Sequence, residues 1–349
     1  MTSVEVLSRA ARIYARGDIR VDAEAPIDGP EPGEVLLRVT SVGLCGSDLH
    51  WFEEGSIGDA ALVRPLVLGH EIGAEIASGP RAGERVAVDP AYDCGRCEPC
   101  VAGRPNLCLT MRFAGHGTTD GAMRTYMTWP ERLLSPLPDS IGDDEAPILE
   151  PLGVALHAVG LARLSAGERA SVYGCGPIGL LLIQLLRARG VSTIVATDKL
   201  AHRVAAARAM GATEAFTIDD ATGPDTSKGR SLARAEAVDV GFEVSGADEA
   251  LSDAIAAVRP GGQVILVGIP PGDKTTFEAA AARRKELSLQ ECRRMLPADL
   301  PRAIELVADG AVDIKSLITA RFSLAEAPAA FAALASRSGL KVIVKPNSD

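Results

Sequence analysis

Four cysteines fall within sixteen residues, in the segment DCGRCEPCVAGRPNLC, and this spacing is typical of a metal-binding loop. Cys94, Cys97 and Cys100 follow one another at C-x-x-C steps, and Cys108 lies eight residues further on. Four thiolates complete a tetrahedral zinc shell and leave no open position, so this site would be structural. An iron–sulfur cluster and disulfides are the alternatives, and a reducing compartment disfavours the disulfides.

A second set of candidate residues combines sulfur, nitrogen and oxygen donors. It lies in the segments GLCGSDLHW, VLGHE and ILEPLG, and its members are Cys45, Ser47, His50, His70, Glu71 and Glu150. One thiolate, one imidazole and one or two carboxylates make an incomplete shell. A catalytic zinc needs such a shell, with three protein ligands and an exchangeable position. Taken singly, Cys45 and His70 would more often be ordinary buried residues.

A glycine-rich turn follows in RASVYGCGPIGLLLIQLLRARG, between a predicted strand and a predicted helix. Gly174, Gly176 and Gly179 form G-x-G-x-x-G, with Pro177 and Ile178 inside the motif. The first glycine permits a tight turn, the second lets the backbone approach a pyrophosphate, and the third permits close packing of helix against strand. The motif therefore predicts a dinucleotide site, and a packing turn without a cofactor is the alternative.

Asp198 ends the next predicted strand, about 20 residues after the motif, where a carboxylate accepts hydrogen bonds from the adenosine ribose. Because a carboxylate there repels a 2′-phosphate, Asp198 favours NAD over NADP. Lys199 and Arg203 weaken this preference, since basic residues nearby could serve a phosphate. Further candidate cofactor contacts lie near the ends of two later strands, at Val244, Gly246, Val267 and Gly268.

Strands and helices alternate over residues 154–290, which predicts a doubly wound parallel sheet and the α/β class. Residues 1–153 contain strand-like segments broken by glycine and proline, so we expect a mainly β domain with the cysteine loop at about 90–110. Residues 291–349 are expected to belong to this first domain, with KVIVKP as a strand that returns to it. A surface loop is predicted at 221–230.

Charge and hydropathy exclude other classes of protein. The 349 residues include 36 basic and 46 acidic ones, a net charge of −10, and no basic stripe that would suit nucleic acid. No apolar run approaches the roughly 20 residues that cross a bilayer. The first residues, MTSVEVLSRAARIYARG, lack an apolar segment followed by a cleavage site. We therefore expect a soluble, cytoplasmic protein that acts on a small molecule.

The ordered motifs G-x-x-C-G-S-D-x-H, G-H-E, the four-cysteine loop, E-P-L and G-x-G-P-x-G resemble those of the zinc-dependent medium-chain dehydrogenases. CGSDLHW, RPLVLGHE and EPLGVALHA are similar to the sorbitol (polyol) dehydrogenase branch. The resemblance implies a GroES-like catalytic domain, a Rossmann domain, NAD, and two zinc ions in each subunit of a homodimer or homotetramer. It also implies Cys45, His70 and either Glu71 or Glu150 as ligands of the catalytic zinc.

We expect hydride transfer between NAD and a secondary alcohol of a polyol or sugar-derived compound, with a proton that passes from Ser47 to His50. Two segments depart from the polyol pattern, MRFAGHGTTDG with His116, and ECRRMLPADLP with Arg293 and Arg294. These arginines could bind a substrate carboxylate, as in aldonate dehydrogenases of the idonate type. The motifs are also compatible with a threonine-type dehydrogenase, or with a non-catalytic protein that binds zinc and nucleotide.

Overall fold

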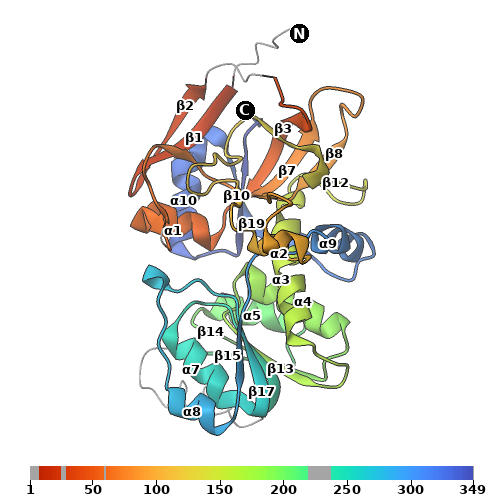
Figure 1. The fold of residues 1–349 in the computed structure, drawn as a ribbon. Helices are drawn as coiled ribbons and strands as arrows, with labels where there is room; N and C mark the ends of the chain where they lie inside the picture. Colours follow the sequence, from red (N-terminus) through yellow and green to blue (C-terminus); the bar gives the residue numbers. More distant parts are fainter. Residues whose placement is uncertain (1–7, 25–28, 59, 219–236, 349) are drawn as a thin grey trace. The chain divides into compact units, whose positions relative to one another are not determined.

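The computed structural model describes residues 8–24, 29–58, 60–218 and 237–348. The predicted loop at 221–230 lies outside these ranges. The chain forms two compact units (Figure 1). Unit 1 comprises Met1–Pro151, Leu296–Asp309 and Asp313–Asp349, and unit 2 comprises Leu152–Met295 and Gly310–Val312.

Unit 1 is mainly β. Its described strands are β1 (Ser8–Ala15), β2 (Asp18–Glu24), β3 (Glu34–Gly43), β4 (Ser56–Ile57), β5 (Ala60–Ala61), β6 (Leu66–Val67), β7 (Glu71–Ile76), β8 (Arg85–Val88), β9 (Ala91–Tyr92), β10 (Arg112–Phe113), β11 (Tyr126–Pro130), β12 (Leu134–Pro136), β19 (Ile318–Ser323) and β20 (Lys341–Lys345). Its helices are α1 (Gly46–Glu54), α2 (Glu98–Val101), α9 (Asp299–Ala308) and α10 (Ala327–Ser336), and α3 (Leu149–Ala162) begins in this unit.

The largest sheet of unit 1 places β3 between β7 and β20, in the order β12-β8-β7-β3-β20-β19, with β11 also paired to β3. Antiparallel register sets Gly43 opposite both Glu71 of β7 and Ile343 of β20. The expectation that KVIVKP returns to the first domain as a strand is therefore confirmed. A core of buried residues from the first 134 positions and from α10 and β20 holds these strands together.

Unit 2 contains a parallel sheet whose described strands are β13 (Arg169–Tyr173), β14 (Thr193–Asp198), β15 (Glu214–Thr217), β16 (Val238–Glu243), β17 (Val258–Leu266) and β18 (Ser288–Glu291). Its helices are α4 (Pro177–Ala188), α5 (Ala201–Ala209), α7 (Asp248–Ala257) and α8 (Ala279–Arg284). The strand order β15-β14-β13-β16-β17-β18 is that of a doubly wound sheet, with its switch point between β13 and β16. The predicted α/β class with a doubly wound parallel sheet is thus confirmed.

Ligands in such sheets bind beyond the carboxyl ends of the strands at the switch point. The glycine-rich turn leaves the carboxyl end of β13, and the segment with Val244 and Gly246 leaves β16. Among the described residues, no helix is long and apolar enough to span a bilayer.

Candidate metal centres and cofactor turn

The side chains of Cys45, His70 and Glu71 converge, and their ligand atoms all lie within 4.8 Å of one another. Cys45 follows the end of β3 and precedes α1, while His70 and Glu71 enter β7 beside it. Gly69 gives the turn before His70 a φ of +95°, and an added Cβ there would lie 2.7 Å from a Val42 methyl group. The close pairing of β3 with β7 therefore brings the three donors together.

Asp48, on the first turn of α1, organises this group although the sequence motifs did not single it out. Its carboxylate accepts hydrogen bonds from the backbone N–H groups of Cys45, at 3.0 Å, and Gly69, at 3.3 Å. The same carboxylate lies 3.6 Å from Nδ1 of His70. Burial lowers the pKa of His70, but the charges and hydrogen bonds of Asp48 and Cys45 outweigh burial and raise it well above its usual value. A carboxylate on one ring nitrogen orients the other one, as in metal-ligating histidines.

Lys341, the first residue of β20, reaches the same group from the far end of the chain. Its Nζ donates to both carboxylate oxygens of Glu71, each at 2.7 Å, and to the carbonyl oxygen of Leu44 at 3.1 Å. Lys341 is 2% exposed and Glu71 is fully buried. Burial lowers the pKa of Lys341, but Glu71 outweighs this effect and raises it, so the two residues form a buried ion pair.

Glu150 lies at the start of α3 and is not one of the three converging donors. Its carboxyl group is buried. Burial raises the pKa of Glu150 to about 7; the charge of Glu71 adds to this rise, and His70 and Lys341 oppose it. The structure thus brings Glu71 into the donor group and leaves Glu150 as a nearby carboxyl that is easily protonated.

Ser47 and His50, the two residues of the predicted proton path, have different hydrogen-bond partners. Ser47 Oγ is 3.3 Å from Nε2 of His70. His50 Nδ1 instead lies 2.8 Å from a carboxylate oxygen of Glu54, one turn further along α1. Within the described part of the chain, no hydrogen bond joins Ser47 to His50. The geometry places Ser47 beside the donor group and leaves the second step of the path without a direct link.

An aromatic side chain that the sequence did not highlight, Phe113 of β10, lies against His70, with ring centroids 5.4 Å apart. His116 packs edge-on against Trp51 of α1 at 5.6 Å. Both contacts come from the segment MRFAGHGTTDG, which departs from the polyol pattern. This segment therefore forms part of the wall around the donor group.

The four clustered cysteines also converge, and their sulfur atoms lie within 4.8 Å of one another. Cys97 Sγ is 3.4 Å from Cys100 Sγ and 3.8 Å from Cys108 Sγ. Backbone hydrogen bonds from Arg96 and Cys97 help to lower the pKa of Cys94 to about 6, whereas burial and its sulfur neighbours raise that of Cys100 to about 12. None of the seven cysteines, all of which lie in the described part of the chain, forms a disulfide.

Both donor sets suit zinc, because zinc takes sulfur, imidazole nitrogen and carboxylate oxygen at short range. Four sulfurs would close a tetrahedral shell, and the mixed set of three would leave one position for a further ligand. The two sets therefore differ in kind: the first could hold a closed metal site, and the second a site that is open to one more ligand.

The glycine-rich turn has the backbone that its motif predicts. Gly174 has a φ of +104°, and its N–H donates to the carbonyl oxygen of Thr197 at 2.8 Å. A Cβ on Gly179 would lie 1.9 Å from the carbonyl oxygen of Gly174, so only glycine fits there. α4 begins at Pro177 and leaves its first N–H groups at the turn, as phosphate binding requires.

Asp198 is buried at the end of β14 and contacts this turn directly. One carboxylate oxygen accepts a hydrogen bond from the N–H of Cys175 at 2.7 Å, and the other accepts one from Leu200 at 2.8 Å. Arg203 Nη1 lies 3.7 Å from the position of a Cβ on Gly176, and Lys199 is exposed. A carboxylate and a guanidinium group therefore both border the turn.

The later candidate contacts form two loops that meet backbone to backbone. Gly246 has a φ of +73°, and a Cβ there would lie 2.3 Å from the carbonyl oxygen of Ile269. A Cβ on Gly268 would lie 2.2 Å from the N–H of Gly246. Val244 and Val267 are tied to the ends of β13 and β16, because their N–H groups donate to carbonyl oxygens there. These loops leave no room for side chains at the two glycines.

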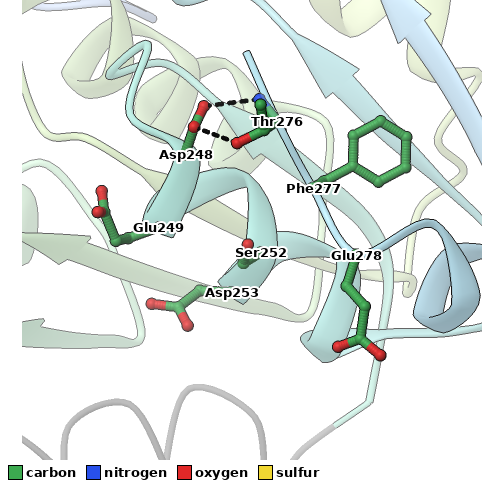
Figure 2. Close-up of a pocket in the computed structure, with 7 residues that line it drawn as sticks. All are labelled: Asp248, Glu249, Ser252, Asp253, Thr276, Phe277 and Glu278. Atoms are coloured by element: carbon green, nitrogen blue, oxygen red, sulfur yellow. Dashed lines mark hydrogen bonds between the residues drawn. The ribbon is translucent and has the colours of Figure 1, made fainter.

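Unit 2 has a separate open hollow, which Figure 2 shows at the start of α7. Its lining consists of Asp248, Glu249, Ser252, Asp253, Thr276, Phe277 and Glu278. Asp248 accepts hydrogen bonds from the N–H of Thr276 at 2.9 Å and from its hydroxyl at 2.5 Å (Figure 2). None of the candidate site residues lines this hollow, and we assign it no ligand.

Comparisons with known proteins identify the family. The model of the alcohol dehydrogenase GroES-like domain matches residues 31–139, and that of the zinc-binding dehydrogenases matches residues 177–309. The chain belongs to the zinc-dependent medium-chain alcohol dehydrogenases, a family of oxidoreductases. Within the family, its similarity is to the sorbitol dehydrogenase branch. The sorbitol dehydrogenase of Bacillus subtilis is 34% identical over 347 residues, which cover 97% of each chain.

Solved structures agree with this assignment. The L-idonate 5-dehydrogenase of Escherichia coli superposes with a TM-score of 0.88 at 26% identity, over 97% of this chain and 98% of that one. A protein of Sinorhizobium meliloti, assigned as a zinc-binding dehydrogenase and solved with NADP bound, has a TM-score of 0.85 at 30% identity. That match covers 98% of this chain and all of the other. The fold and the family expected from the sequence are therefore confirmed.

Proposed function

We propose that the protein transfers a hydride between NAD and a secondary alcohol of a polyol or sugar-derived substrate. The observation that carries this proposal is the convergence of Cys45, His70 and Glu71 within 4.8 Å, an incomplete donor set suited to catalytic zinc. The 34% identity to a sorbitol dehydrogenase supports the substrate class. The four cysteines from Cys94 to Cys108 would hold a second, structural zinc in each subunit.

Each residue of the mixed site has a task in this reaction. Cys45, His70 and Glu71 would hold zinc, which when bound lowers the pKa of an alcohol hydroxyl group. Asp48 orients the His70 ring through its carboxylate, 3.6 Å from Nδ1. Ser47, whose hydroxyl lies 3.3 Å from His70 Nε2, can take the proton that leaves the substrate hydroxyl.

From Ser47 the proton must reach solvent. Because no hydrogen bond joins Ser47 to His50 in the described part of the chain, a bridging water would have to carry the proton to His50. Glu150, a buried carboxyl whose pKa is raised to about 7, could bind a water near the donor group and hold a proton there. Phe113 contacts His70 and narrows the space around the reacting atoms.

The glycine turn and Asp198 support NAD as the cofactor. A carboxylate at the end of β14 disfavours a 2′-phosphate, and the N-terminus of α4 suits the pyrophosphate. Arg203 beside the turn and the NADP bound to the Sinorhizobium relative keep NADP as the competing cofactor. We further propose a cytoplasmic location, because clustered thiols without disulfides persist in a reducing compartment. The resemblance to the polyol dehydrogenases suggests a homodimer or homotetramer.

A second candidate substrate class is the aldonates. The structural match to an L-idonate 5-dehydrogenase favours it, as does the departure of the MRFAGHGTTDG segment from the polyol pattern. Arg293 and Arg294 remain the candidate partners of a substrate carboxylate, because a guanidinium group can bind a carboxylate through two hydrogen bonds.

A substrate and cofactor panel tests the proposal. Polyols, aldonates and simple secondary alcohols are offered with NAD and with NADP, and the absorbance of reduced nicotinamide is followed. We expect turnover with NAD and at least one polyol or aldonate. Turnover of aldonates alone would favour the second candidate. A zinc-loaded protein that binds NADH but oxidises none of these alcohols would overturn the proposed function.

A further inference from the structure

The ion pair between Lys341 and Glu71 is unusual because both side chains are almost completely buried. Glu71 has no exposed surface and Lys341 is 2% exposed. A buried carboxylate without a counter-charge is strongly unfavourable, so its charge must be balanced inside the protein. Lys341 supplies that balance through bonds of 2.7 Å to both carboxylate oxygens.

A zinc ion at the mixed site would also interact with the negative charge of Glu71. Glu71 is one of the three donors within 4.8 Å of one another, so its carboxylate would neutralise part of the charge of the metal. The carboxylate would then face two cations at once, the metal and the ammonium group. Cations that share one carboxylate in a buried site repel each other strongly, because little water screens them.

We propose that Lys341 acts as an internal substitute for zinc. It holds Glu71 in place when the metal is absent, and it weakens the binding of zinc when the metal arrives. Lys341 is thus a positioning residue that keeps the mixed site formed without metal. This inference rests on the zinc site of the proposed function.

The fold supports this role, because Lys341 has a second contact besides Glu71. Its ammonium group also donates to the carbonyl oxygen of Leu44, the residue directly before Cys45. The N–H of Leu44 in turn donates to the carbonyl oxygen of Val342 at 3.0 Å. The start of β20 therefore fixes both the carboxylate of Glu71 and the backbone beside Cys45.

A thermodynamic cycle predicts the direction in which the substitution of Lys341 changes the affinity for zinc. Lys341→Met removes the hydrogen-bonded ammonium partner of Glu71 from the metal-free protein, whereas bound zinc still balances this carboxylate in the loaded protein. The substitution therefore destabilises the metal-free form more, and the variant must bind zinc more tightly. We expect affinity about tenfold higher or more, within the range of coupling between linked sites. If Lys341 merely stabilised the fold, both forms would lose stability equally and the affinity would not change.

The experiment measures zinc affinity and thermal unfolding without any substrate. The metal is removed with a chelator and returned in competition with a chromogenic chelator, and unfolding is followed for the metal-free and loaded proteins. The four-cysteine site is an internal control, and its affinity should stay the same. Unchanged or weaker binding of zinc at the mixed site of Lys341→Met would overturn the inference.

Companion variants keep the test decisive if Lys341→Met does not fold without metal. Lys341→Arg keeps the charge, and a guanidinium group can also bind both carboxylate oxygens, so its zinc affinity should stay close to that of the parent protein. Lys341→Gln loses the charge but keeps a hydrogen-bond donor, so it should fold and still bind zinc more tightly. The double variant Glu71→Gln/Lys341→Met removes both charges, and should recover stability without metal but bind zinc weakly. A Lys341→Gln variant with unchanged affinity would count against the inference.

These measurements separate the inference from the proposed function. A parent protein that oxidises no alcohol would refute the function and leave the zinc measurements valid. A parent protein with normal turnover and a Lys341→Met variant with unchanged zinc affinity would refute the inference alone.

Discussion

The two candidate metal centres of unit 1 differ in how the chain assembles them. The four-cysteine centre comes from one continuous loop, Cys94 to Cys108, which contains only α2 and one short 3₁₀ turn. The mixed centre combines the end of β3 with the start of β7, and is completed by Lys341, which lies 270 residues from Glu71. A local centre depends on its own ligands, whereas a long-range centre also depends on the packing between strands.

Because of this difference, we expect the loop centre to affect stability and the mixed centre to affect catalysis. The loop centre has four donors and no open position, so a metal there would only hold the loop together. The mixed centre has three donors and lies beside Ser47 and Phe113. Damage to the first should appear in unfolding, and damage to the second should appear in turnover.

The largest effect is expected for Cys45→Ser, which replaces the sulfur donor of the mixed centre. Turnover should fall by a factor on the order of a thousand, because loss of the metal removes several kcal/mol of transition-state stabilisation. Steady-state kinetics with NAD measures this loss, while NADH binding and the thermal midpoint should change little. Full activity in this variant would contradict the assignment of the catalytic centre.

Cys97→Ser should show the opposite pattern. Three remaining thiolates cannot close the shell, so the variant should bind one zinc fewer and unfold at a midpoint roughly 10 °C lower. Metal analysis and thermal unfolding measure both quantities. Below its unfolding range, the variant should keep most of its turnover. A stable variant with its full metal content would show that the loop needs no metal.

These two centres also differ in how far sequence reasoning could reach. All four loop ligands could be predicted because their spacing alone brings them together. Cys45, His70 and Glu71 could be predicted as candidates from their residue types, but a choice between Glu71 and Glu150 depends on the register of β7 against β3. Lys341 was missed because a single lysine in KVIVKP shows no partner until β20 pairs with β3.

Within the same motif, Asp48 was missed for another reason. Its sequence position was visible in CGSDLHW, but its task depends on the orientation of the His70 ring. The parallel sheet of unit 2 was predictable, because alternating strands and helices are local patterns. Its close contacts, such as that of Gly246 with Ile269, follow from packing and carry no signal in the sequence.

A third, smaller effect tests the strand packing of the mixed centre. Gly43→Ala introduces a Cβ 2.0 Å from a carboxylate oxygen of Glu71, so that side chain must move. Zinc affinity of the mixed centre should fall about 10- to 100-fold, as when the support of a metal ligand is lost. Gly46→Ala is the matched control, because a Cβ there meets nothing within 4 Å. Equal effects of the two substitutions would mean that the close approach is unimportant.

The smallest effect is expected where the loop centre contacts the rest of unit 1. Arg132 Nη1 lies 2.9 Å from a carboxylate oxygen of Asp93, and Nη2 donates to the Asp93 carbonyl oxygen at 3.1 Å, directly before Cys94. The arginine side chain is 52% exposed, so water screens this pair. Arg132→Ala should therefore cost less than about 1 kcal/mol of stability.

The same substitution should leave the zinc content unchanged, since the four sulfurs converge through their own loop. Thermal unfolding and metal analysis are carried out on Arg132→Ala and on Gly43→Ala. The first substitution changes a residue that supports the loop centre, and the second changes one that supports the mixed centre. If Arg132→Ala released zinc as readily as Cys97→Ser does, the loop centre would depend on its surroundings as strongly as the mixed centre does. The contrast between a local and a long-range metal centre would then be wrong for this protein.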